Sequence, residues 1–167
     1  MDNNKNNNKP LSPQWTAAIF FAVFGFFFLL LTKYMLLSLQ QSAALPFFPA
    51  SLVALITGGF LGYLFGQQLI KERAWGYVFL LGLVIGVVAI ILISIAVFIH
   101  AYFYDPTIIN HLQHWRDYFI IYGIIFLSLL LTVGLWLILF MGLAAVYFNK
   151  RFWPTLVAIE KKSLNKP

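Results

Sequence analysis

Four long runs of apolar residues, separated by short polar segments, make up most of the chain. Each run has at least the roughly 20 residues that a helix needs to cross the apolar core of a bilayer. The pattern therefore predicts an all-α, polytopic integral membrane protein, a bundle of four transmembrane helices. The predicted spans are residues 15–36, 48–70, 77–100 and 119–148.

The first and fourth runs each need further interpretation. The first is longer than the roughly 7–15 apolar residues of a signal peptide, and Lys33 separates it from the small residues 42–44. We interpret it as an uncleaved helix. The fourth is longer than a bilayer core is thick, so its helix should tilt, kink near Gly134 or project into the cytoplasm.

Composition supports lipid as the main solvent of the chain. Of the 167 residues, 62% are hydrophobic and 10% are charged, whereas a soluble domain has roughly a quarter charged residues. The mean hydropathy is +0.87. The formal net charge of +6 does not indicate a nucleic-acid partner, because the basic residues flank the apolar runs, where they suit lipid head groups. The absence of cysteine excludes disulfides and thiolate-ligated metals.

The positions of the basic residues predict the orientation in the membrane. The N-terminal tail, the second loop and the C-terminal tail are basic, and they fall on one side only if the chain has four spans. The positive-inside rule makes that side cytoplasmic. We expect a multi-pass protein of the cell inner membrane with both termini in the cytoplasm, and residue usage favours a bacterial source. The basic residues concerned are Lys5, Lys9, Lys71, Arg73, Lys150, Arg151, Lys161, Lys162 and Lys166.

Three regions are predicted along the chain. Residues 1–14 form a disordered, polar cytoplasmic tail, residues 15–153 the transmembrane domain, and residues 154–167 a basic cytoplasmic tail. Pro154 should separate that tail from the fourth helix. The tail could lie on the inner leaflet or act as a docking segment.

Small residues form the most regular local pattern. They recur at every fourth position of the second run, and a shorter version follows in the third. A face of small residues allows another helix backbone to approach closely. We expect the second and third helices to form a hairpin packed through these faces, with homo-oligomerisation, partner docking or a pore lining as alternatives. The residues are Ala50, Ala54, Gly58, Gly62 and Gly66 in the second run, and Gly82 and Gly86 in the third.

The loop before the fourth run predicts a short extracytoplasmic interfacial helix. Asp105 and Pro106 suit a helix start, and the apolar and polar residues that follow fall on opposite faces. His111, His114 and Asp117 lie on the polar face at a spacing that could bind Zn²⁺ or sense pH. A solvated polar face explains them better, so we predict no metal and no cofactor.

Chemistry inside the membrane has few candidates. No span contains Asp or Glu, which argues against proton-coupled transport; the small multidrug transporters share the helix count but depend on a carboxylate in the first helix. An intramembrane hydrolase would need Ser94 or Ser128 beside His100, and nothing in the sequence brings such a pair together.

The function expected from these patterns is non-enzymatic. The chain should act through helix packing, as an accessory or assembly subunit or an envelope-maintenance factor, with the lipid bilayer and other membrane proteins or itself as partners. The alternative is a small oligomeric transporter or channel, whose shared cavity would need polar side chains. The candidates for those side chains are Thr57, Tyr63, Ser94, Ser128 and Thr132.

Overall fold

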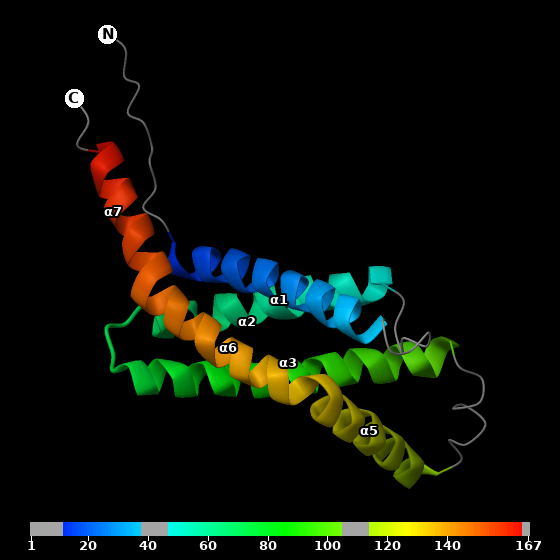
Figure 1. Cartoon of the computed structure of the whole chain (residues 1–167). Coiled ribbons are helices and arrows are strands. Elements are labelled where there is room, and N and C mark those ends of the chain that lie inside the picture. Colours follow the sequence, from blue (N-terminus) through cyan, green and yellow to red (C-terminus); the bar gives the residue numbers. More distant parts are fainter. Residues whose placement is uncertain (1–11, 38–46, 105–113, 165–167) are drawn as a thin grey trace.

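The structure, a computed structural model, is all-helical across the residues it describes, which are 12–37, 47–104 and 114–164. Within these ranges four helices are long and apolar enough to cross a membrane, which confirms the predicted helix count (Figure 1). The elements are α1 (Pro13–Leu37), α2 (Phe47–Leu69), α3 (Trp75–Tyr104), α5 (Trp115–Leu129), η1 (Leu130–Gly134), α6 (Leu135–Tyr147), η2 (Phe148–Phe152) and α7 (Trp153–Leu164).

The small-residue face of α2 packs against α1, so the predicted pairing of this face with α3 was wrong. A methyl group added at Gly58 or Gly62 would collide with the α1 backbone, at the carbonyl oxygens of Phe21 and Ala17 respectively. One added at Gly66 would lie 2.9 Å from the Gln14 Cα atom. Because α1 contributes small residues of its own to this contact, the two backbones approach closely.

Gly82 and Gly86 of α3 face α6 instead of α2. A methyl group at Gly82 would lie 2.7 Å from the Gly142 Cα atom, and one at Gly86 would lie 2.8 Å from the Ile138 Cα atom. The bundle therefore consists of two tightly packed antiparallel pairs, α1 with α2 and α3 with α6 (Figure 1).

Aromatic rings join the two helix pairs. Phe20 of α1 lies with its ring centroid 5.1 Å from that of Phe148 and 4.9 Å from that of Phe152. Phe21 and Phe148 are both completely buried. Within each pair, small residues let the helix backbones touch. Between the pairs the helices lie farther apart, and large aromatic rings fill the space.

The fourth helix is interrupted by two π-turns. Its helical segments run from Trp115 to Leu164, and the π-turns η1 and η2 separate α5, α6 and α7. The Leu135 N–H bonds to the Leu130 carbonyl oxygen, and the Trp153 N–H bonds to that of Phe148, five residues back in each case. The first π-turn ends at Gly134, where a kink was one of the predicted outcomes. Figure 1 shows α7 turning away from the bundle after the second.

Pro154 does not end the fourth helix, contrary to prediction. The helix continues from Trp153 to Leu164 as α7. Proline removes one backbone donor, but Pro154 is the second residue after η2, where the hydrogen-bond register shifts from four residues to five. The missing donor therefore falls at a point where the regular ladder is interrupted anyway.

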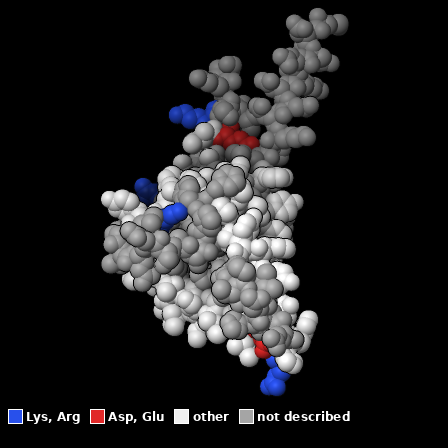
Figure 2. All heavy atoms as spheres, turned by 90° about the vertical axis from the view of Figure 1, so that its right-hand side faces the viewer, with Lys and Arg blue, Asp and Glu red and all other residues white. Residues whose placement is uncertain are grey.

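The predicted interfacial helix lies mostly outside the described residues, since residues 105–113, including His111, are not described. The described part begins at His114, and α5 starts at Trp115, four residues before the predicted start of the fourth span. Charged side chains gather at the margins of the molecule. Figure 2 shows them at the upper and lower ends of the face viewed and toward its left side, and the other described residues on this face are uncharged.

Candidate functional site

A buried amide connects the fourth helix to the end of the second. Asn149 is 7% exposed, and its Nδ2 atom donates to the carbonyl oxygen of Leu69, the last residue of α2. The same amide donates to the Lys71 carbonyl oxygen at 3.1 Å. The last four carbonyl groups of a helix have no partner within the helix. Asn149 therefore supplies donors that the end of α2 lacks.

Lys150 makes a second contact with the same loop. Its Nζ atom donates to the Arg73 carbonyl oxygen at 3.1 Å. Asn149 and Lys150 both belong to η2, so the π-turn directs two consecutive side chains toward the connection between α2 and α3. Positive charge is favourable beside the exposed carbonyl groups at a helix C-terminus.

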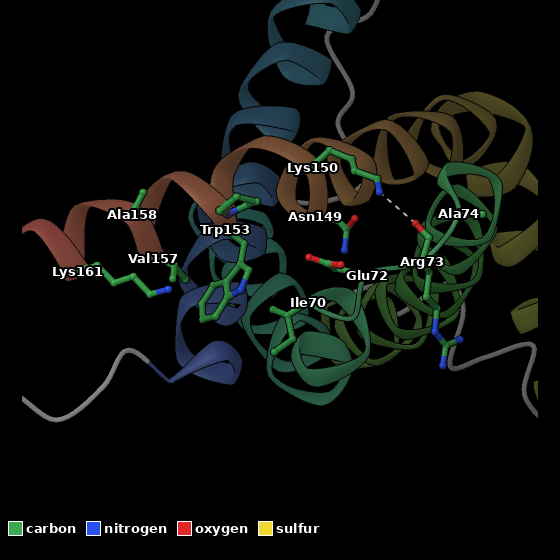
Figure 3. A pocket seen from close by; sticks show the side chains of 11 residues that line it. Ile70, Glu72, Arg73, Ala74, Asn149, Lys150, Trp153, Val157, Ala158 and Lys161 are labelled. Atoms are coloured by element: carbon green, nitrogen blue, oxygen red, sulfur yellow. Dashed lines mark hydrogen bonds between the residues drawn. The ribbon is translucent and has the colours of Figure 1, made fainter.

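A cleft opens between this loop and α7. Its volume is about 700 Å³, and residues from η2 and α7 form one wall while residues 70–74 form the other (Figure 3). The lining residues are Ile70, Glu72, Arg73, Ala74, Asn149, Lys150, Trp153, Pro154, Val157, Ala158 and Lys161. The cleft is amphipathic, because an apolar surface of aliphatic side chains and one indole ring lies beside charged groups.

The charged side chains of the cleft are not equivalent. Figure 3 shows the Glu72 carboxylate lying between Asn149 and Ile70, and the Lys161 side chain running back along α7 toward Val157. The Arg73 guanidinium points away from the cleft and lies over the Tyr77 ring, 4.2 Å from its centroid. Glu72, Lys150 and Lys161 are therefore the charged groups available to a molecule in the cleft.

The outward face of α5 is a second candidate surface. None of the 15 residues of α5, all of which are described, is fully buried. Phe119 and Ile124 are each 64% exposed, and a methyl group added at Gly123 would meet nothing within 4 Å. The Ser128 hydroxyl is also exposed and has no hydrogen-bond partner among the described residues.

The inward face of α5 holds to α3 through a hydroxyl pair and through the Phe98 ring of α3, which meets the Tyr122 ring of α5 edge-on. The completely buried Ser94 hydroxyl lies 3.0 Å from the Tyr122 hydroxyl and donates to the Ile91 carbonyl oxygen at 2.8 Å. The His100 ring stacks on Tyr104, with centroids 4.6 Å apart. Within the described residues, no hydrogen bond joins His100 to Ser94 or Ser128, so the hypothetical serine–histidine pair is not assembled there.

Of the weak metal candidates His111, His114 and Asp117, the two that the structure describes take part in a helix start. The His114 backbone N–H donates to a carboxylate oxygen of Asp117 at 2.7 Å, as the acidic half of a capping box does. The His114 Nδ1 atom lies 4.0 Å from the same oxygen. Asp117 thus has a structural role at the beginning of α5, while His111 lies outside the described residues.

The five polar side chains that a transport cavity would need are dispersed. Thr57 and Ser94 are buried, whereas Tyr63, Ser128 and Thr132 are exposed, and none of the five lines the cleft. Thr132 donates to the carbonyl oxygen of Ser128 in its own helix at 2.8 Å. Thr57 and Tyr63 lie on α2, Ser94 on α3, and Ser128 and Thr132 on the fourth helix.

Sequence reasoning missed the role of Asn149 and the cleft. Asn149 stands at the end of an apolar run, where a polar residue is ordinary, and its bonding partners lie about 80 positions earlier. The usable signals were the tail after Pro154, with its apolar residues and basic end, and the Lys71–Arg73 cluster. Comparisons with protein-family models, with curated proteins and with solved structures find no significant match to this chain.

Proposed function

We propose that this chain is a non-enzymatic multi-pass protein of the cell inner membrane, acting as an accessory or assembly subunit that packs against another membrane protein. Four apolar helices support the membrane placement. The basic residues of the described loop and of α7 support cytoplasmic termini, because positive charge is retained on the cytoplasmic side.

The observation that carries the proposal is the outward face of α5. Helices in lipid associate through close backbone approach and hydrogen bonds, because burial of apolar side chains gains little against lipid tails. Gly123 offers an approach point with no described neighbour, and Ser128 offers a hydroxyl without a described partner. The glycine faces of α2 and α3 are already occupied within the chain, so they are not available for a partner.

Replacing Gly123 with Leu tests this surface, because a Cβ atom added there meets nothing within 4 Å and the backbone need not move to accept it. We expect the wild-type chain, purified from its native membrane in mild detergent, to carry a stoichiometric membrane-protein partner that Gly123→Leu loses. Mass spectrometry of the purified complex is the measurement. Gly76→Leu is the matched control, because a Cβ atom added at Gly76 also meets nothing within 4 Å, but Gly76 lies in the first turn of α3 and not on α5.

Two results would contradict the proposal. One is a partner that remains bound to Gly123→Leu as firmly as to the control. The other is a lone homo-oligomer, which would favour the alternative of a small oligomeric transporter or channel.

A further inference from the structure

We propose that the cleft between α7 and the 70–74 loop is a binding site for a phospholipid with a primary ammonium head group, phosphatidylethanolamine. The inference rests on the membrane placement proposed above. It goes beyond the packing role, because it assigns a ligand to a site that lies away from α5.

The charged groups of the cleft are complementary to those of this head group. A phosphatidylethanolamine head group carries one phosphate and one ammonium group separated by two carbons. The cleft presents two ammonium groups, those of Lys150 and Lys161, and one carboxylate, that of Glu72. The phosphate would accept from the Lys161 ammonium, and the lipid ammonium would donate to the Glu72 carboxylate.

Glu72, Lys150 and Lys161 are available to a ligand. All three residues are exposed. Lys150 uses one of its three donors on the Arg73 carbonyl oxygen, and Glu72 has neither an ion pair nor a hydrogen bond among the described residues. Arg73 lines the cleft, but its guanidinium lies over the Tyr77 ring and does not pair with the Glu72 carboxylate.

The cleft also has an apolar wall. Ile70, Trp153 and Val157 line the cleft next to the charged groups, and α7 continues from a helix long enough to cross a membrane. The indole ring of tryptophan favours the boundary between head groups and acyl chains. A soluble phosphate ester would leave this wall uncovered, whereas the glycerol and upper acyl carbons of a lipid would cover it.

Lipid retention on the purified full chain tests the proposal. Native mass spectrometry would compare adducts formed with equal additions of phosphatidylethanolamine, phosphatidylcholine and phosphatidylglycerol. We expect phosphatidylethanolamine to be retained most. The choline head group has the same phosphate but no N–H donor for Glu72, and the glycerol head group has no cation.

Two adjacent lysines provide the matched variants. Lys161→Gln should weaken phosphatidylethanolamine retention about two- to fivefold, the effect expected for one exposed charge pair. Lys162→Gln removes the same charge one position later on α7, outside the cleft lining, and should leave retention unchanged. Glu72→Gln should abolish the preference over phosphatidylglycerol while phosphate binding persists.

Several results would overturn the proposal. Equal retention of the three lipids would remove the head-group selectivity, and equal effects of Lys161→Gln and Lys162→Gln would place binding elsewhere. Displacement of the lipid by soluble phosphoethanolamine at a similar concentration would show that the site recognises a free phosphate ester. Loss of lipid preference in a protein that still inserts into membranes would refute this inference alone, whereas failure to insert would refute the proposed function.

Discussion

Asn149 shows how one side chain can connect distant elements. It lies in η2, and its amide satisfies carbonyl groups at and just after the end of α2. A buried carbonyl group that accepts no hydrogen bond destabilises the folded protein, because nothing replaces the water that solvated it in the unfolded chain. Every described side-chain nitrogen or oxygen that is buried has a hydrogen-bond partner, and Asn149 is one of the few polar residues among them.

Removing this amide should destabilise the protein. We expect Asn149→Ala to lower the free energy of unfolding by about 1–3 kcal/mol, because two carbonyl groups lose their donor. Asn149→Asp should cost more, because a carboxylate would face those carbonyl oxygens. Thermal unfolding in detergent is the measurement, with the exposed Gln67→Ala as control. Identical melting of Asn149→Ala, Asn149→Asp and wild type would show that the bonds contribute nothing.

At the scale of helices, the sequence predicted which elements exist better than which elements meet. The four apolar runs correspond to four helices, because length and hydropathy are local properties. The small-residue positions of α2 do face another helix, but that helix is α1. Periodicity identifies a face without identifying its partner. The sequence of α1 contains a signal for this pairing, because Ala17, Ala18 and Gly25 are small residues that allow the α2 backbone to approach.

The continuation through Pro154 could not be predicted for a different reason. A proline normally ends or kinks a helix, and no sequence pattern marks the π-turn that accommodates it. The cleft depends on this continuation, since α7 forms one of its walls. Local sequence patterns could not predict this cleft. Its walls come from residues about 80 positions apart, and one wall belongs to a helix that was predicted to end at Pro154.

The contact between α1 and α2 gives a prediction at this scale. Gly62→Leu places a side chain against the α1 backbone at Ala17 and Ala18, which cannot move aside as a flexible side chain can. We expect destabilisation of at least about 1–3 kcal/mol, the usual cost of overpacking. Gly76→Leu, with open space around the glycine, should have little effect. If both variants denature together with the wild type in increasing denaturant, the α1–α2 contact does not hold the fold.

At the scale of the whole molecule, the distribution of basic residues favours one orientation of the helix bundle in the membrane. Between residues 70 and 74, and again on η2 and α7, basic residues lie at the end of the bundle where the cleft opens. Tyr34, Tyr104 and Arg116 lie at the ends of their helices that connect to the other loops. The proposed membrane placement would put the cleft at the cytoplasmic surface and the start of α5 on the outside.

Single-cysteine labelling tests this placement most directly, because the chain has no cysteine and each introduced thiol is unique. We expect a membrane-impermeant maleimide to label Tyr34→Cys and Arg116→Cys in intact cells, and Lys71→Cys and Lys162→Cys only after the membrane is opened. Labelling of Lys71→Cys and Arg116→Cys from the same side would contradict the four-span arrangement, and with it the membrane position of the cleft.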